Sequence, residues 1–418
     1  MHREVIRPRE NWQRKVEDIG FEWHTSTTDA GTPLPYWDES ACWVLTPDEV
    51  DVIEAATNDL HEMSMEVVER VVTERLYTAI GYPDSVADLV EESWRRHNSN
   101  ETAVYGRFDL AFPGLGEGNV TPKMLEYNAD TPTGLFEAAV AQWHWLQDCH
   151  PNGDQFNSIH EALVAAWGGL RAENAGSNTL HLTSLAPHPE DEGTVRYMQD
   201  VAIEAGFATK MIAAADIGWS VPEGDEAAEA YFVDLAGARI STLYKLLPWD
   251  WALSDPFGDQ LAQAVMSRSL RVIEPAWKLV LSSKGILPIL WDMFPGHPNL
   301  LESHFETSKF KSGVDVFAKP KLGREGANIS LATLGARGQI VGSPHASVAG
   351  PYGKEGYIYQ AAAPMARAEG RAADGTNCTF HAVIGSWVIG NESRGIGMRE
   401  DTNVITQNTS RFVPHRMS

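Results

Sequence analysis

The sequence predicts an α/β (α+β) fold, and three patterns carry this prediction. A long amphipathic helix begins after Thr46, an antiparallel hairpin lies between residues 105 and 128, and a β-α-β unit lies between about residues 178 and 250. With 418 residues, 43% of them hydrophobic, the chain can bury a large core and form two or three structural units.

The first helix has a complete start signal. Thr46 is suited to be the N-cap, Pro47 fits the first helical position, and Glu49 can close a capping box. Apolar residues then recur at helical spacing, at Val50, Ile53, Leu60, Met63, Val67 and Val71. We therefore expect a long helix with one apolar face.

The middle and the last third of the chain alternate strand and helix patterns. Residues 179–185 and 208–214 are predicted strands on either side of a helix at 192–206. The last third is predicted to begin with a helix bearing Trp277 and Lys284. Short strands are expected there at 316–320 and 357–360, joined by glycine-rich loops.

Charge and cysteine content limit the classes of partner. Asp and Glu number 57 against 33 Lys and Arg, a net charge of −24 that repels nucleic acids and anionic lipids. Three scattered cysteines do not make a disulfide framework, so we expect a cytoplasmic protein. Residues 1–15 lack the apolar run of a signal peptide, and we expect no membrane partner. The sequence carries no signal for oligomeric state.

The predicted hairpin gathers four polar side chains on one face. Strand alternation puts Arg107 and Asp109 on the same face of the first strand, and Glu126 and Asn128 on the same face of the second. If the hairpin closes symmetrically, Arg107 faces Asn128 and Asp109 faces Glu126. Two carboxylates and an amide oxygen are ligands suited to magnesium, and the arginine could clamp a phosphoryl group. The alternative is a solvated face with surface ion pairs.

The turn after this hairpin offers a second set of polar groups. Asp130, Thr131 and Thr133 lie in a turn that should cap the next helix, beside the expected metal. A substrate carboxylate could bind there. Ordinary capping of the helix explains the same residues, and the two interpretations are compatible.

Lys319 lies at the end of a predicted strand and precedes a glycine-containing loop at 320–329. A lysine in this position can reach phosphates while the loop folds over them. Without its loop, Lys319 is better explained as a surface lysine at a strand end than as a phosphate ligand. The chain has no Walker A pattern, no H-E-x-x-H zinc motif and no G-x-S-x-G elbow, so P-loop and common hydrolase mechanisms lack support.

Five segments together resemble the glutathionylspermidine synthase family, and most closely its stand-alone members. They are residues 105–109, 125–133, 284–298, 319–329 and 397–401. The likeness extends along nearly the whole chain. It implies an ATP-grasp fold of the glutathionylspermidine synthetase type with an inserted small α/β unit.

The resemblance also implies a division of the chain. We expect an N-terminal part with the metal-binding hairpin at 1–175, a small substrate-side unit at 176–255, and a C-terminal ATP-grasp part at 256–418. Bifunctional members of the family add an N-terminal cysteine amidase domain. This chain lacks it, so we do not expect hydrolysis of the conjugate.

The family's motifs imply roles for individual residues. Asp109, Glu126 and Asn128 would hold two Mg²⁺ ions, and Arg107 would contact the transferred phosphoryl group. Arg399 resembles a mobile arginine that stabilises the acyl phosphate. The implied ATP-binding residues are Lys284 and Lys319 on the phosphates, Gly323, Arg324, Glu325 and Gly326 in the covering loop, Gln360 beside the adenine, and Val404, Ile405 and Thr406 near the nucleotide.

Substrate residues are less defined by the resemblance. Bifunctional members have Ser at the position of Thr131 and Thr near that of Leu246, both close to glutathione. Glu190 and Asp191 fall where those members carry acids that could receive a polyamine, although a solvated acidic loop explains them equally well. The candidate substrate contacts are therefore two pairs of residues: Asp130 and Thr131, and Glu190 and Asp191.

The expected function is that of an ATP- and Mg²⁺-dependent ligase joining a small-molecule carboxylate to an amine through an acyl phosphate. A peptide acid and a polyamine are possible substrates by resemblance. Two alternatives belong to other classes: a nucleotide-binding regulatory module without ligase activity, and a kinase that phosphorylates a small molecule. An amide product formed alongside ADP would separate the ligase from both.

Overall fold

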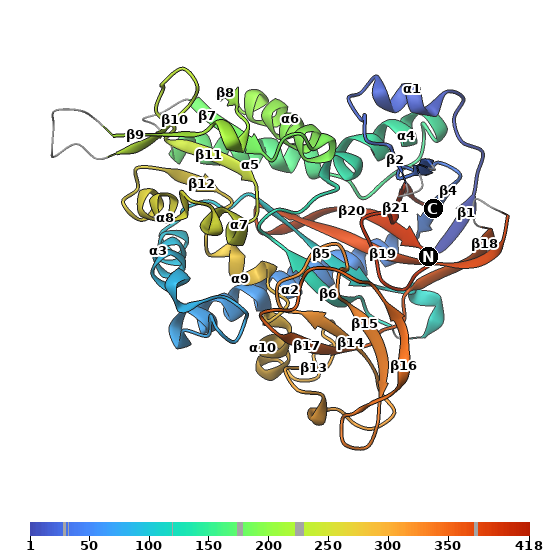
Figure 1. The fold of residues 1–418 in the computed structure, drawn as a ribbon. Helices are drawn as coiled ribbons and strands as arrows, with labels where there is room; N and C mark the ends of the chain where they lie inside the picture. The colour runs from blue at the N-terminus through green and yellow to red at the C-terminus, as the bar shows by residue number, and fades with distance from the viewer. Residues whose placement is uncertain (28–30, 32, 119, 174–178, 222–229, 372–374) are drawn as a thin grey trace.

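The computed structural model describes the chain except for residues 28–30, 32, 119, 174–178, 222–229 and 372–374. Three large sheets form its frame. Figure 1 shows a four-stranded sheet in green and yellow at the top, a six-stranded sheet in cyan and red in the middle, and a five-stranded sheet in orange at the bottom. The mixture of helices and sheets agrees with the predicted α/β (α+β) class.

The six-stranded sheet is antiparallel and joins a hairpin from the first third of the sequence to strands from its last part. Its order is β21-β20-β19-β5-β6, with β18 also paired to β19. The strands are β5 (Tyr105–Ala111), β6 (Lys123–Asn128), β18 (Ala366–Arg371), β19 (Asn377–Ile389), β20 (Glu392–Asp401) and β21 (Arg411–Val413). The predicted hairpin register is confirmed: Arg107 lies opposite Asn128 and Asp109 opposite Glu126, with a register shift directly after Asp109.

The five-stranded sheet is also antiparallel, in the order β13-β17-β14-β15-β16. Its strands are β13 (Ser303–His304), β14 (Asp315–Pro320), β15 (Ser330–Leu334), β16 (Ile340–Ser347) and β17 (Tyr357–Ala361). The strands expected at 316–320 and 357–360 are therefore present. They pair with each other, and Lys319 lies opposite Ile358.

The four-stranded sheet is parallel and confirms the predicted β-α-β unit. Its order is β12-β11-β7-β8, and α6 (Pro189–Glu204) connects β7 to β8. The strands are β7 (Thr179–Ser184), β8 (Ala208–Met211), β11 (Thr242–Leu246) and β12 (Arg271–Ile273). Because β12 lies beyond residue 255, the sheet extends past the unit expected at 176–255, and the three-part division stays a prediction.

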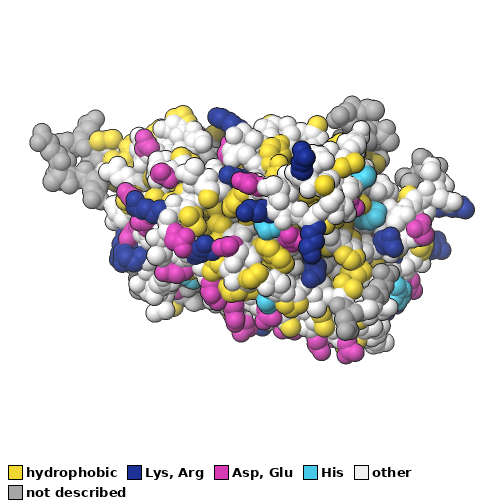
Figure 2. Space-filling model, turned by 90° about the horizontal axis from the view of Figure 1, so that it is seen from below, with side chains coloured by type: hydrophobic (Ala, Val, Ile, Leu, Met, Phe, Trp, Pro, Cys, Tyr) yellow, Lys and Arg dark blue, Asp and Glu magenta, His cyan; other side chains and the backbone are white. Residues whose placement is uncertain are grey.

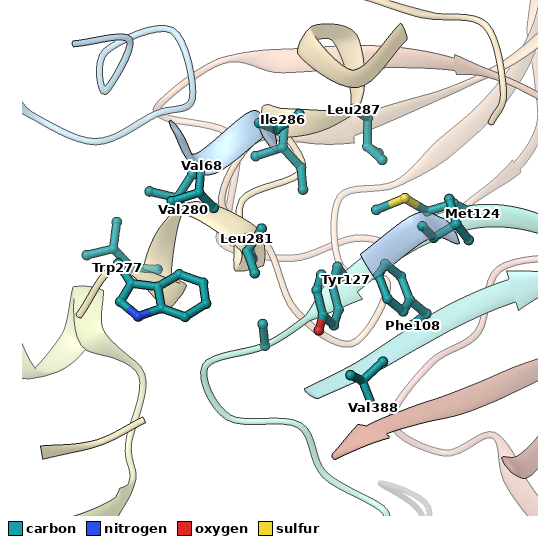
Figure 3. Packing of buried hydrophobic residues seen from close by; sticks show 14 of the residues in the cluster. Val68, Phe108, Met124, Tyr127, Trp277, Val280, Leu281, Ile286, Leu287 and Val388 are labelled. Carbon is teal, nitrogen blue, oxygen red and sulfur yellow. The ribbon is translucent and has the colours of Figure 1, made fainter. Parts of the chain in front are cut away.

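The long helix α2 (Pro47–Glu74) begins as the sequence predicts. The Thr46 side chain accepts a hydrogen bond from the Glu49 amide, and the Glu49 carboxylate accepts one from the Thr46 amide. The apolar face of α2 packs onto the six-stranded sheet. Figure 3 shows this core: Val68 of α2 lies on one side, with Phe108 and Tyr127 of the hairpin and Val388 of β19 on the other. The Phe108 and Tyr127 rings stack with centroids 3.7 Å apart.

The helix expected to bear Trp277 and Lys284 is in fact two short helices, α9 (Lys278–Ser282) and α10 (Ile286–Met293), which corrects that prediction. Lys284 lies in the break between them, where its amide bonds the Lys321 carbonyl at 2.9 Å. Pro288 explains the interruption, because it has no amide to donate to the Lys284 carbonyl four residues earlier. The break turns Lys284 toward the hairpin.

The remaining elements cover the frame. The three-stranded sheet β1-β4-β22 brings the two chain termini close together. The other strands are β1 (His2–Val5), β2 (Thr25–Thr27), β3 (Pro33–Pro35), β4 (Ala41–Leu45), β9 (Gly218–Ser220), β10 (Tyr231–Val233) and β22 (His415–Met417). The other helices are α1 (Trp12–Glu17), α3 (Ala87–His97), the π-helix η3 (Glu137–Ala141), α4 (Gln142–Cys149), α5 (Ile159–Glu173), α7 (Trp249–Ser254) and α8 (Gly258–Met266), with short 3₁₀ turns η1 (Asp84–Val86), η2 (Leu115–Glu117), η4 (Ala214–Asp216) and η5 (Thr307–Lys309).

The surface is mixed in character. On the face seen in Figure 2, Lys and Arg side chains are scattered among Asp and Glu and among apolar side chains. Among the described residues, none of the helices is both long enough and apolar enough to cross a bilayer.

Candidate active site

The hairpin β5–β6 presents its polar face toward the space between the six-stranded and five-stranded sheets. Arg107 binds Asp109 with both prongs of its guanidinium, Nε to Oδ1 at 2.7 Å and Nη2 to Oδ2 at 3.2 Å. Its Nη1 donates to the Thr133 carbonyl, in the turn after β6. Gly385 of β19 leaves room for this arginine, since a Cβ there would lie 2.9 Å from the Arg107 side chain.

Glu126 is the centre of a second cluster on the same face. Its Oε2 lies 2.9 Å from Lys284 Nζ, and its Oε1 accepts a hydrogen bond from Asn128 Nδ2 at 3.0 Å. Lys284 also donates to the Gly323 carbonyl at 2.8 Å. Lys284 thus connects the hairpin to the glycine loop that follows β14.

Lys319 approaches the hairpin from the five-stranded sheet. Its Nζ donates to the Leu125 carbonyl at 3.0 Å and to Gln360 Oε1 at 2.6 Å. Gln360 is buried behind Lys319 and donates to the Met124 carbonyl at 3.0 Å. The bonds to Leu125 and Met124 fix the five-stranded sheet against β6, on the side expected for ATP, and the Lys319–Gln360 bond links the two side chains that make them.

Between the two sheets lies a cavity of about 590 Å³, which we call the main cleft. It has charged groups at one end and an apolar lining at the other. The lining residues are Asp109, Leu125, Glu126, Phe317, Lys319, Gly326, Ile329, Ala363, Met365, Val383, Val404, Ile405 and Thr406. Seven of the predicted site residues therefore face one space.

A smaller cavity of about 320 Å³ adjoins the main cleft, and we call it the side cavity. Its lining residues are Arg107, Asp109, Thr133, Gly134, Val383, Gly385, Trp387, Gly397, Arg399, Thr406 and Phe412. Asp109 and Thr406 line both cavities. The carboxylate of Asp109 therefore stands at the boundary, with Arg107 and Arg399 on the far side of it.

Arg399 belongs to β20 and binds the loop that follows. Its Nη2 donates to the carbonyls of Gln407, Asn408 and Ser410 at 2.7, 3.2 and 3.0 Å. The same loop carries Val404, Ile405 and Thr406 into the main cleft. Arg399 thus holds one wall of the cleft while lining the side cavity.

The glycine loop contributes Gly326 and Ile329 to the wall of the main cleft. Gly326 has φ +70°, and a Cβ there would lie 2.2 Å from the Thr406 carbonyl, so only glycine fits this contact. Glu325 also has a positive φ, of 56°. Arg324 points away from the cleft and binds Asp250 of α7, with Nη1 to Oδ2 at 3.2 Å. Of the loop's predicted ATP contacts, Gly326 lines the cleft and Gly323 reaches Lys284.

The acids expected for an amine substrate lie at the start of α6. Burial raises the pKa of Glu190, partly offset by Arg399, and burial also raises the pKa of Asp191. Glu325 adds further repulsion to both acids, so these three carboxylates share one region. The sequence did not single out Glu137, which belongs to this region: burial and repulsion from Glu190 raise its pKa to about 7.

Glu137 is fully buried, and one of its oxygens lacks a partner among the described side chains and backbone. Its other oxygen accepts a hydrogen bond from Trp23 Nε1 at 2.9 Å. Only its electrostatic coupling to Glu190 marks Glu137 as a site residue. No local pattern distinguishes it from an ordinary helical glutamate.

Asp130 and Thr131 lie apart from both cavities. Asp130 is buried and binds Lys245 Nζ through Oδ1 at 2.8 Å and the Trp249 amide through Oδ2 at 2.7 Å. Thr131 is half-buried, and its neighbour Thr133 lines the side cavity. The structure does not bring Asp130 to the polar face of the hairpin. Its carboxylate instead binds Lys245 and the start of α7.

The charges of the site fit a divalent cation and a phosphate. Desolvation would raise the pKa of Glu126, but Lys284, Lys319 and two hydrogen bonds lower it to about 2. Desolvation raises the pKa of Asp109 despite Arg107, and it lowers that of Lys319 to about 8. A divalent cation between the two carboxylates would offset the desolvation of Asp109, and phosphate would offset that of Lys319.

The donor set is hard and oxygen-rich, which suits magnesium better than zinc. Among the described residues there is no group of three His, Cys, Asp or Glu that could hold a metal. The candidate set has two carboxylates and the amide of Asn128, so phosphate oxygens or water would have to complete the shell.

Most of the cleft's apolar lining was not predicted. Phe317, Ile329, Met365 and Val383 look in sequence like any core residues of strands and loops. Their role becomes visible only when the two sheets face each other. The side cavity's Trp387 and Phe412 were missed for the same reason.

A fold of this kind, two antiparallel sheets enclosing a cleft with acids on one sheet and a lysine on the other, belongs to the ATP-grasp class. The solved structure of a glutathione synthetase-like effector from Globodera pallida, in its apo form, matches over 98% of this chain and 95% of its own, with a TM-score of 0.58. Identity is 9%, so this likeness concerns the fold alone.

Sequence comparison defines the family. The family model described as glutathionylspermidine synthase preATP-grasp matches residues 3–418, and the chain therefore belongs to the glutathionylspermidine synthase family. A Haemophilus influenzae protein named "Putative acid--amine ligase" is 35% identical over 408 residues, covering 96% of this chain and 95% of that protein. The prediction of family and of a ligase-class enzyme is confirmed.

Two further relatives are longer proteins. The trypanothione synthetase of Crithidia fasciculata is 27% identical, and the bifunctional glutathionylspermidine synthetase/amidase of Escherichia coli is 24% identical. Each match covers 86% of this chain. The chain spans 54% and 56% of their lengths, about half of each.

Proposed function

We propose that this protein is a cytoplasmic ATP- and Mg²⁺-dependent ligase that joins a carboxylate to an amine through an acyl phosphate. One observation carries the proposal. The oxygen ligands Asp109, Glu126 and Asn128 share one face of a hairpin, and the cations Arg107, Lys284 and Lys319 surround that face. A site that handles phosphate needs both kinds of group within a few ångströms.

In this proposal, Asp109, Glu126 and Asn128 hold Mg²⁺, which would neutralise the phosphate charge and orient the γ-phosphate. Lys284 and Lys319 bind phosphate oxygens, because both amines already lie beside Glu126. The apolar end of the main cleft, with Phe317, Met365 and Ile405, receives the adenine. The glycine loop excludes water from the phosphates.

The acid substrate belongs in the side cavity. Its carboxylate can reach Arg107 there, on the far side of Asp109 from the main cleft. Arg107 would stabilise the charge that develops as carboxylate oxygen attacks phosphorus, and Arg399 would hold the resulting acyl phosphate. Thr133 borders this space from the turn after β6, and Thr131 lies two residues before it in the same turn.

The amine substrate approaches past α6. Glu190 and Asp191, with Glu137 behind them, form an acidic region that favours a cationic amine. The names of the relatives support this pairing of an acid with an amine. A thiol peptide and a polyamine are the first substrates to test.

The test uses purified protein with Mg²⁺, ATP and a panel of peptide acids and amines, followed by mass spectrometry for the condensed product and an assay for ADP. We expect amide and ADP in equal amounts. Glu126→Ala should lower the rate at least about a hundredfold, since removing such a group costs roughly 3 kcal/mol of transition-state stabilisation. Glu392→Ala, an exposed acid on β20, is the matched control.

The alternatives predict different outcomes. A kinase would give a phosphorylated acceptor with ADP and no amide. A regulatory module would bind ATP without consuming it, whatever acid and amine are supplied. Unchanged ADP release by Glu126→Ala with a true substrate would overturn the assignment of the metal site.

A further inference from the structure

The glycine loop is attached to the parallel-sheet unit through one ion pair. Arg324 Nη2 lies 2.5 Å from Asp250 Oδ1 and Nη1 lies 3.2 Å from Oδ2, a two-pronged contact. The guanidinium also lies over the Trp251 ring, 4.9 Å from its centroid. The Arg324 and Asp250 side chains are 30% and 19% exposed, so water screens this pair only in part.

Asp250 and Trp251 lie on α7, a short helix whose first residue, Trp249, is held by Asp130. The Trp249 amide donates to Asp130 Oδ2 at 2.7 Å, and Trp249 is fully buried. Asp130 is also bound by Lys245 at 2.8 Å. Because Asp130 follows Asn128 by two residues, α7 is connected through Asp130 to the chain that carries the candidate metal ligands.

On its other side, the loop is attached to the cleft itself. Gly326 packs on the Thr406 carbonyl, and the Gly323 carbonyl accepts a hydrogen bond from Lys284. Arg324 lies between these two contacts along the chain. With its side chain on α7, the loop is held at three points, and Gly326 and Ile329 place it along the wall of the main cleft.

We propose that the Arg324–Asp250 pair, seated on Trp251, is a latch that holds the glycine loop over the main cleft. Asp250 contacts neither cavity and is a positioning residue for the nucleotide loop. Arg324 then acts chiefly through Asp250, and its expected role as a direct ATP contact is secondary. The proposal rests on the proposed function only in that the covered space binds ATP.

Trypsin tests the latch directly, because it cleaves after Arg324 only when that side chain is free and the loop is open. We expect Asp250→Asn to raise the cleavage rate at this bond at least about tenfold in the full-length protein, since cleavage follows the open population. Asp292→Asn is the matched control: it removes another Arg–Asp pair, between Asp292 of α10 and Arg70 of α2, and that arginine is also 30% exposed. Cleavage of Asp292→Asn should stay at the wild-type rate.

A second variant covers the case in which Asp250→Asn unfolds. Arg324→Lys keeps a trypsin site and a positive charge but loses the two-pronged contact, so it too should be cut faster. Thermal melting checks that each variant is folded. Wild-type cleavage rates in the folded variants would overturn the latch.

Kinetics then test its consequence for ATP. Asp250→Asn should raise the KM for ATP several-fold more than it lowers kcat, while Asp292→Asn leaves both unchanged. An unchanged KM in the presence of faster cleavage would overturn the positioning role. The cleavage comparison does not require catalysis. If the protein fails to bind ATP, the proposed function is contradicted, but the cleavage rates still test whether the Arg324–Asp250 pair holds the loop.

Discussion

Lys284 Nζ lies 2.9 Å from Glu126 Oε2, so a lysine in a break between two short helices is paired with a candidate metal ligand on a hairpin 158 residues earlier in the chain. The same amine holds the Gly323 carbonyl. One side chain therefore connects the helical layer, the hairpin and the glycine loop.

Replacing this lysine should destabilise the ligand-free protein. Lys284→Met keeps most of the side chain's volume but leaves Glu126 with Asn128 as its remaining hydrogen-bond donor. We expect the free energy of unfolding in urea to fall by about 2 kcal/mol, the typical value of a hydrogen bond to a charged group. Lys309→Met, at an exposed position, is the control. Equal stability of the two variants would contradict the pairing.

The contact between the glycine loop and the strand-end loop can be tested at Gly326. In Gly326→Ala the new methyl group would meet the Thr406 carbonyl at 2.2 Å, so the loop must move. ATP binding should weaken at least about tenfold, which corresponds to roughly 1.4 kcal/mol. Gly237→Ala shares the positive φ, +74°, but has open space around it, and it should lower stability without changing ATP affinity. Titration with ATP by calorimetry measures both.

Arg399 should control the mobility of the loop it binds. Arg399→Gln removes three charge-assisted bonds to the carbonyls of Gln407, Asn408 and Ser410. We expect amide hydrogen exchange in residues 403–410 to accelerate at least about tenfold. Arg394→Gln, on the same strand but paired with exposed Glu392, should leave exchange there unchanged. Unchanged hydrogen exchange of residues 403–410 in Arg399→Gln would show that other contacts hold this loop.

Stability should fall in mild acid, partly through His61. Burial, aided by Lys278, lowers the pKa of His61 to about 4, below its ordinary value of 6.5. As pH falls below 6.5, His61 binds a proton in the unfolded chain but stays neutral in the folded protein. The free energy of unfolding therefore decreases until about pH 4, and below that pH the contribution of His61 is constant. The slope from this one group is at most about 1.4 kcal/mol per pH unit.

The measurement compares urea unfolding between pH 4 and 7 for His61→Gln and for His2→Gln, an exposed control. His61→Gln should have a shallower pH dependence than the parent, although other groups such as buried His415 still contribute. A slope identical to that of the parent would contradict the depressed pKa of His61.

Local patterns were sufficient where the determining contacts are local. The capping box at Thr46 and Glu49 and the pairing of Asp109 with Glu126 depend on a few neighbouring residues, and both are present as predicted. Alternation along two strands was enough to gather the oxygen ligands. The strand that ends at Lys319 was found in the same way.

Long-range packing explains what could not be predicted. The break at Lys284 depends on its hydrogen bond to Lys321 as well as on Pro288. Arg324 lies against α7 because it contacts Asp250 and Trp251 there. Glu137 becomes a site residue only because it lies close enough to Glu190 for the two carboxylates to repel each other. Such juxtapositions depend on the assembled sheets and leave no periodic trace in the sequence.

The pairing of β5 with β19 has a consequence for how the protein is made. Leu110 lies opposite Ile384, so the central sheet cannot be completed until the segment that carries Ile384 has left the ribosome. Until then β5 exposes an edge rich in apolar residues, which favours intermolecular strand pairing. Nascent chains of this protein should therefore depend on chaperones, and truncation before residue 377 should yield aggregates in place of a smaller folded enzyme.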